Sequence, residues 1–328
     1  MAVRWVKRED IDKVKWNSCV HYAYNGNIFG YVWYLDFIGK SWTALIEDDY
    51  QAVMPLIYRP GLHKMEIHQP SFIRELGIFS YAPLNSHRVK YFFDAIPEEY
   101  RVINMRVSEE CKPTDIHGFK VSEKTNHVLS LLQSYENLAG RYSPVFRNAL
   151  DKSIANGFRS AESITPEEYA AFYEKNGQGN KRQREKDKHA LLRIIYNALH
   201  RGWGFLSGIA DEKGELLAAD FYITSHSRMM SLAPVISKNG EASGAAAMQF
   251  DFLLRTNAGK PLLFDFNEDQ SFINPTHVHA MPYPFYDIKK DVRIAGIWYS
   301  INQCFLLEWT VKGVFQSARK LIRLYYYE

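Results

Sequence analysis

The segment from residue 235 to 259, VISKNGEASGAAAMQFDFLLRTNAG, holds residues whose types and spacing could bind a ligand. A β-branched run stops at Ser237, small residues fill most positions from 240 to 247, and a helical pattern continues to about Asn257. Small side chains let a ligand approach the backbone, and a helix start offers unpaired N–H groups and the positive end of the helix dipole. The chemistry that this pattern favours is the binding of an anion such as a phosphate.

Spacing excludes two familiar phosphate loops for this segment. No Lys-Ser/Thr pair follows Gly244, as a P-loop requires, and the chain has no GxGxxG, as a dinucleotide-binding fold requires. A structural explanation stays open beside the anion site. In it, Ser243 caps the helix, and the alanines are good helix formers that pack tightly on a sheet.

Further polar side chains follow the apolar run PLLFDF. Asp265 and Glu268 lie at the end of that run, and strand alternation places them on opposite faces. His277 and His279 share a face if their segment is extended. A metal site would need a third ligand, however, and the spacing signature is incomplete. We therefore expect no metal.

The composition predicts a globular protein in a reducing compartment. The 328 residues include 40 Lys and Arg against 37 Asp and Glu, and a net charge of +3 implies no polyanionic partner. Three cysteines without CxxC spacing argue against a zinc site or a disulfide framework. The N-terminus does not resemble a secretory signal, and no run of about 18 apolar residues could span a membrane. We expect a cytoplasmic protein.

The elements that would position the segment read as strand, strand, strand, helix, strand. WGFLSGIAD, ELLAADFYITS and RMMSLAPVIS predict an antiparallel meander, and PLLFDF predicts the strand after the helix. Two helices precede the meander, the first capped by Thr165. The N-terminal half repeats this order more loosely. The sequence therefore predicts two similar domains, residues 1–135 and 136–328.

This order of elements, together with VISKNGEASGAAA, resembles the GNAT acyltransferase superfamily. The corresponding loop of that superfamily, Q/R-x-x-G-x-G/A, binds the pyrophosphate of acetyl-CoA. Gly240 and Ala242 fit the end of the pattern, whereas Ser237 stands where Gln or Arg begins it. The resemblance implies that acetyl-CoA or another acyl-CoA is the cosubstrate, bound by Val235, Ile236, Ser237, Gly240, Ala242, Ser243, Gly244 and Ala245.

The whole chain is similar to a narrower group, the two-domain FemAB-like GNAT proteins. WYLDFIGKSWTALIEDDYQAVMPLIYR, IHQPSFIRELGIFS and YSPVFRNALDKS carry this likeness. It implies an α/β fold of the α+β type, with two tandem GNAT-like domains that each hold a mixed, mostly antiparallel sheet flanked by helices. FemAB-type relatives transfer amino acids from charged tRNA to a cell-wall precursor. The helices between residues 165 and 202 leave no room for the long helical arm of some relatives.

In a GNAT-like site the acyl thioester lies where two neighbouring strands splay apart, and backbone N–H groups polarise its carbonyl. Pro234 has no N–H for a sheet ladder, so it fits such a splay and fits an ordinary edge strand equally. The resemblance assigns the backbone contacts to Val235 through Ser237, the general base to Glu268 and the general acid to Tyr286. The plainer alternatives are a surface carboxylate and a core-edge tyrosine.

Two charged segments lie outside this site. The run NKRQREKDKH, residues 180–189, could contact phosphates, although mixed charge favours a solvated helix face. The tail CFLLEWTVKGVFQSARKLIRLYYYE reads as an amphipathic helix that docks on its own domain. Peripheral contact of that helix with anionic lipid is the alternative.

We therefore expect an N-acyltransferase that moves an acetyl or other acyl group from acyl-CoA to an amine. The acceptor would be a small molecule or a cell-envelope precursor. Two alternatives stay open: a FemAB-type aminoacyltransferase that uses aminoacyl-tRNA, and a degenerate acyltransferase fold that acts as a binding module without catalysis.

Overall fold

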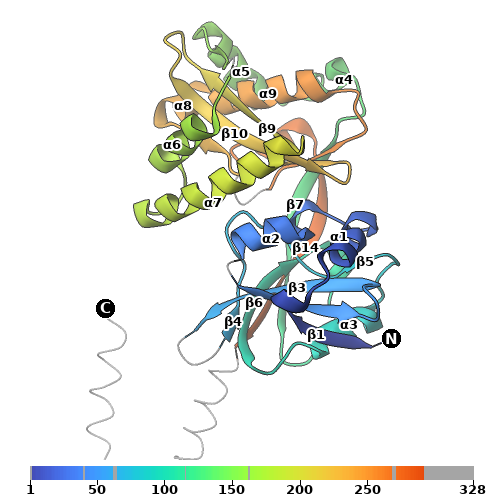
Figure 1. Cartoon of the computed structure of the whole chain (residues 1–328). Helices are drawn as coiled ribbons and strands as arrows, with labels where there is room; N and C mark the ends of the chain where they lie inside the picture. The colour runs from blue at the N-terminus through green and yellow to red at the C-terminus, as the bar shows by residue number, and fades with distance from the viewer. Residues whose placement is uncertain are drawn as a thin grey trace, which may run out of the picture.

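The computed structural model describes residues 2–39, 41–61, 65–114, 116–161, 163–267 and 271–291. They form two lobes joined by two long strands, β7 (Lys120–Ser130) and β14 (Met281–Asp291) (Figure 1). The first lobe contains β1 (Val3–Lys7), α1 (Lys13–Tyr22), α2 (Val32–Ile38), β2 (Trp42–Glu47), β3 (Ala52–Pro60), β4 (Met65–Ile67), β5 (Phe79–Ser80), α3 (Ser86–Asp94) and β6 (Tyr100–Val107).

The second lobe begins with helices and continues with the predicted meander. Its elements are α4 (Tyr135–Ala139), α5 (Pro144–Ala155), β8 (Arg159–Ser160), α6 (Pro166–Asn176), α7 (Lys181–His200), β9 (Gly204–Ala210), β10 (Leu216–Ser225), β11 (Arg228–Ser231), β12 (Val235–Ile236), α8 (Lys238–Ser243), α9 (Ala245–Asn257) and β13 (Leu263–Asp265). The helix predicted from Ala245 to Asn257 is confirmed, as is the Thr165 cap, which forms a reciprocal capping box with Glu168.

One sheet runs through both lobes in the order β1-β2-β3-β4-β6-β14-β7-β13-β11-β10-β9-β8. From either outer edge of this sheet inward, antiparallel strands are followed by one parallel pair. The parallel pairs are β4 with β6 in the first lobe and β11 with β13 in the second. This mixed, mostly antiparallel sheet with flanking helices confirms the predicted fold class.

The strands β7 and β14 exchange between the two lobes. β7 follows β6 in the chain but pairs with β13, and β14 follows β13 but pairs with β6. The two strands also pair with each other, from Met281 opposite Val128 to Lys289 opposite Lys120. The predicted boundary between residues 135 and 136 falls at the start of α4, five residues after β7 ends. Residues 281–291, which were assigned to the second domain, return to the sheet of the first lobe.

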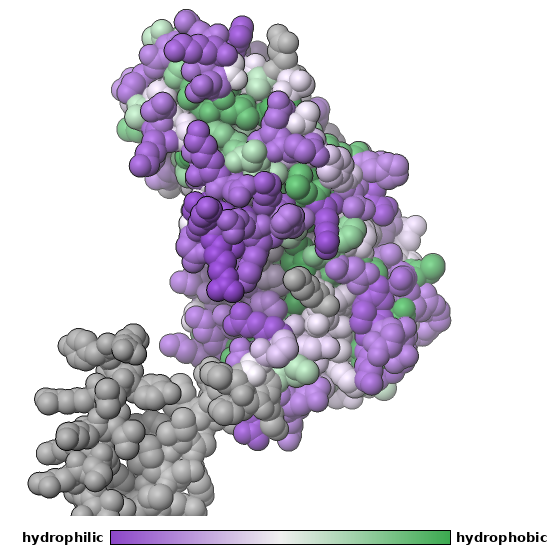
Figure 2. All heavy atoms as spheres, turned by 60° about the vertical axis from the view of Figure 1, so that its left-hand side comes forward, coloured by the Kyte–Doolittle hydropathy of each residue, from purple (hydrophilic) through white to green (hydrophobic). Residues whose placement is uncertain are grey.

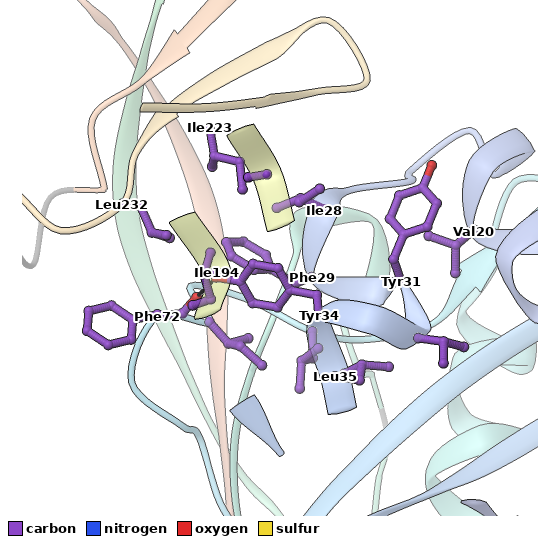
Figure 3. Packing of buried hydrophobic residues seen from close by; sticks show 14 of the residues in the cluster. Val20, Ile28, Phe29, Tyr31, Tyr34, Leu35, Phe72, Ile194, Ile223 and Leu232 are labelled. Atoms are coloured by element: carbon purple, nitrogen blue, oxygen red, sulfur yellow. Dashed lines mark hydrogen bonds between the residues drawn. The ribbon is translucent and has the colours of Figure 1, made fainter. Parts of the chain in front are cut away.

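A shared apolar core also holds the lobes together. In Figure 3, Ile28 and Phe29 of the first lobe lie beside Ile194 of α7 and Ile223 of β10, and all four side chains are buried. Helices α6 and α7 cover this face of the second half-sheet, and α5 and α9 cover the other. Because successive residues of a strand point to opposite faces, β10 contributes Phe221 to the first face and Tyr222 to the second.

No helix of the described residues has the length and apolar character that would cross a bilayer. The predicted amphipathic tail helix and Cys304 lie outside the described residues. Cys19 and Cys111 are buried free thiols.

Candidate functional site

The predicted small-residue loop contains a short helix, α8, in place of an open loop. Ser237 caps α8, because its side chain accepts a hydrogen bond of 3.1 Å from the Gly240 N–H. Gly244 then takes a left-handed conformation at φ +82° and starts α9 without any side-chain cap. The alternative in which Ser243 caps the longer helix is therefore wrong. The Ser243 hydroxyl instead donates to the carbonyls of Asn239 and Gly240.

Close packing explains why the residues of this segment are small. A Cβ on Gly244 would lie 2.2 Å from the carbonyl oxygen of Ala149 in α5, and one on Gly240 would lie 2.3 Å from that of Leu217 in β10. Lys152 and Ser153 of α5 also donate hydrogen bonds to the carbonyls of residues 242 and 243, at 2.6 and 3.0 Å. Helix α5 thus covers the junction of α8 and α9 that was predicted to bind an anion.

The pairing of neighbouring strands is interrupted beside this junction, where the sequence predicted a splay. β11 pairs with β13 only as far as Met230 opposite Asp265. The chain then breaks at residues 232–234 and resumes as β12, which pairs with β10 alone. Pro234 lies in the break, as its missing N–H requires. β12 therefore has an edge without a partner strand among the described residues.

The register of β12 shows which backbone group faces that edge. Ser237 donates its N–H to Leu217 across the pair at 2.8 Å, and Val235 stands opposite Ala219 in the same register. In an antiparallel pair, residues alternate between those that bond to the partner strand and those that point away. The Ile236 N–H consequently points away from β10, toward the splay. Of the three residues predicted to give backbone contacts, Ile236 is the one that is free to do so.

A buried carboxyl group lies at the same break. Asp220 of β10 is 3% exposed, accepts a hydrogen bond from the Ser231 hydroxyl, and accepts a second from the Ala233 N–H at 3.4 Å. Burial raises its pKa to about 7. Sequence reasoning missed this residue, although an aspartate inside the apolar run LLAADFYI is a signal for it.

A narrow slot runs past Asp220 on the α9 face of the sheet. Its volume is about 40 Å³, and its walls include Tyr222, Pro234, Ala246 and Phe266. Such a volume accommodates a few water molecules and is too small for the arm of an acyl-CoA.

The predicted acid, Tyr286, does not line this slot. Tyr286 is 4% exposed in β14, where it packs in the core of the first lobe with Ile103 and Val107. Glu268 lies outside the described residues. The histidines predicted to share a face differ in conformation, because His277 belongs to a 3-10 turn over residues 275–278 and His279 is left-handed at φ +54°. No group of three or more His, Cys, Asp or Glu among the described residues could hold a metal ion.

Asp265 is at the centre of a buried ionic cluster that ties the lobes together. It pairs with Arg74 of the first lobe and with Arg228 of β11, the latter at 3.2 Å. Asn126 of β7 and Tyr283 of β14 each donate a further hydrogen bond of 2.8 Å to it. Both carboxylate oxygens of Asp265 thus accept hydrogen bonds within the protein, which is the arrangement of a structural anchor.

The charged run of residues 180–189 forms the first half of α7. Arg182 and Lys186 are exposed one turn apart, and neither makes an ion pair within the described chain. Asp187 is buried and accepts a hydrogen bond of 2.8 Å from Gln183. The view that brings this end of α7 forward is hydrophilic over much of its surface (Figure 2). The run therefore forms an exposed helix face.

Comparison with known proteins identifies the fold. No family model and no curated protein matches the sequence. Among solved structures, FemX is 13% identical with a TM-score of 0.56, and the match covers 87% of this chain and 97% of FemX. The chain has a FemX-like fold. The likeness confirms the predicted FemAB-like, tandem GNAT architecture, and an identity this low bears on the fold alone.

Two further structures share the arrangement over nearly their whole length. A conserved protein of unknown function from Bacteroides thetaiotaomicron is 13% identical with a TM-score of 0.51, over 86% of this chain and 98% of that one. The C-terminal DUF2156 domain of a proposed lysylphosphatidylglycerol synthetase from Agrobacterium fabrum is 11% identical with a TM-score of 0.50. That match covers 92% of this chain and 98% of the domain. These structures thus share the fold that the chain has in common with FemX.

Proposed function

We propose that this chain transfers an acyl group from an activated donor to an amine, with the reaction at the splay between β12 and β13. The observation that carries the proposal is the free edge of β12. There the Ile236 N–H faces away from β10, and the pairing between β13 and β11 has ended. A fixed backbone donor in a buried site stabilises the oxyanion of acyl transfer without the cost of reorganising water.

The reaction requires two proton transfers. The amine nitrogen bonds to the carbonyl carbon, and that carbon's bond to the sulfur or oxygen of the donor breaks. The amine loses one proton and the leaving group gains one. Asp220 lines the slot on the α9 face, and burial raises its pKa to about 7, so a substantial fraction of the molecules carry a proton there near neutral pH that the leaving group would accept. Glu268 stays the predicted base for the amine.

Acetyl-CoA or another acyl-CoA is the first proposed donor, because a GNAT-like fold supports it. A second donor, an aminoacyl ester of tRNA, is favoured by one observation. Helix α5 covers the start of α9 at Gly244, where a GNAT-like protein would bind the pyrophosphate of its cofactor. The slot near Asp220 also has a volume of only about 40 Å³. The acceptor amine belongs to a small molecule or a cell-envelope precursor in both versions.

Product analysis tests this proposal. The full-length protein would be incubated with acetyl-CoA and a mixture of primary amines, and separately with bulk aminoacyl-tRNA and the same amines. We expect mass spectrometry to find an amide that depends on the protein, together with release of free thiol or uncharged tRNA. No amide with either donor class would contradict the proposal and leave the non-catalytic binding module.

A further inference from the structure

A cavity of about 390 Å³ lies between the two lobes, apart from the slot at Asp220. The loop after α1, the turn after β6, and the β10-β11 hairpin all contribute to its walls. Cavities of this size at domain interfaces are typical of small-molecule sites. Its apolar wall includes Ile28, Val128, Leu132, Ile223, Met230 and Leu262.

The cavity holds a buried carboxylate with one free oxygen. Glu75 lines it and is 4% exposed. Its Oε1 accepts a hydrogen bond of 2.5 Å from Arg74 and lies 3.9 Å from Arg228. No described residue donates to its Oε2, and this oxygen is not among the fully buried polar atoms that lack a partner, so it is accessible to a molecule in the cavity. A carboxylate oxygen that faces a cavity can accept a charge-assisted hydrogen bond, which a ligand in this cavity would supply.

The charged residues around the cavity determine which sign of charge a ligand should carry. Arg74 and Arg228 are balanced by Glu75 and Asp265, to which both are paired. His226 also lines the cavity, and burial lowers its pKa, which keeps the ring neutral near pH 7.

Two acidic groups remain at the mouth of the cavity. Glu109 and Glu110 are exposed there, and neither has an ion-pair partner in the described chain. The nearest basic side chain of that turn, Lys112, lies 5.5 Å from the centre of the Tyr286 ring. The cavity therefore has an excess of negative charge, which repels an anion and attracts a cation.

We propose that this cavity binds a compound with a primary ammonium group joined to an apolar chain. The ammonium donates to Glu75 Oε2, Glu109 and Glu110 draw it in, and the chain lies along Ile28, Ile223 and Met230. In calling this compound the amine acceptor, the inference rests on the proposed function. The location is consistent with that role, because Ile223 and Met230 belong to the strands that continue to the splay.

Binding without any acyl donor tests the inference. The probe is n-hexylamine, with hexan-1-ol and hexanoate as controls of equal chain length, measured by isothermal titration on the full-length protein at neutral pH. A ligand of this size binds at best in about the millimolar range. We expect hexylamine to bind about tenfold tighter than hexanol, and hexanoate not to bind. Equal affinity of the amine and the alcohol would overturn the inference.

Variants locate the site. Glu75→Gln should weaken hexylamine binding about tenfold, the loss of one charge-assisted hydrogen bond. Glu47→Gln is the matched control, because Glu47 is also buried and paired with an arginine, Arg88, but lies outside the cavity. If Glu75→Gln does not fold, the double variant Glu109→Gln, Glu110→Gln should weaken binding severalfold, with the exposed Glu215→Gln as control. Unchanged affinity in that double variant would overturn the inference.

The two proposals fail in different ways. If hexylamine binds through Glu75 but no amide forms with any donor, the acyltransferase proposal fails and the cavity assignment stands. If amides form while the Glu109 and Glu110 changes leave KM for the amine unaltered, the transferase stands and the cavity assignment fails.

Discussion

Asp220 illustrates what one buried carboxyl group does to stability and chemistry. It belongs to β10 and lies beside the break between β11 and β12. There it accepts hydrogen bonds from residues 231 and 233, which holds them in place. The sequence could have indicated its importance, because Asp220 is the one charged residue inside the apolar run LLAADFYI. Its partners could not be predicted, because the break at Pro234 displaces the next residues from the regular pairing pattern.

The raised pKa of Asp220 makes stability depend on pH. Between its ordinary value of 3.8 and about 7, the unfolded chain releases a proton that the folded chain retains. The free energy of unfolding therefore falls as pH rises through this window, by on the order of 4 kcal/mol at most. The Asp220→Asn variant has no carboxyl group to ionise, so its free energy of unfolding should lack this pH dependence. Urea unfolding of both proteins at pH 5 and pH 8 would measure the difference. The same pH dependence in both proteins would refute the assignment.

At the scale of elements, the α8-α9 junction shows how one pattern fits two structures. Small residues before a helix predicted an anion loop or a tightly packed helix. The structure has the second, with α5 packed against Gly244. Local sequence determined where α9 begins and ends, but contact with α5 depends on residues about ninety positions away.

Glycine substitutions measure that packing. Gly244→Ala should lower the free energy of unfolding by about 2–4 kcal/mol, because φ is +82° and the new Cβ meets a backbone oxygen. Gly214→Ala is the control, since its φ is +84° with no atom within 4 Å of a Cβ, and it should cost only about 1 kcal/mol. Equal losses in urea unfolding would contradict the close contact.

For the whole molecule, the decisive feature is the exchange of β7 and β14. The sequence predicted the succession of strands and helices along the C-terminal half, and more loosely along the N-terminal half, because those features follow from local periodicity. It could not predict that residues 281–291 return to β6, because such pairing joins segments about 180 positions apart and leaves no local signal. The buried pair of Arg74 and Asp265, 191 positions apart, escaped prediction for the same reason.

The exchange predicts that the lobes unfold together. Ile288 of β14 is fully buried in the core of the first lobe. Ile288→Ala should cost about 2–5 kcal/mol and should lower the protection of β2 in the first lobe and of β9 in the second equally. Hydrogen exchange in increasing denaturant, read by mass spectrometry, measures both segments. Loss of protection in β2 alone would show that the lobes unfold independently.

The central claim is that the Ile236 N–H at the free edge of β12 supports acyl transfer. Proline at this position removes the N–H without breaking a ladder bond to β10, and alanine shortens the side chain but keeps the N–H. With the donor and amine that give product, we expect Ile236→Ala to keep kcat within a few fold. Ile236→Pro should lower it about 100-fold or more. Equal activity of the two folded variants would contradict the account, because the oxyanion would then be stabilised elsewhere.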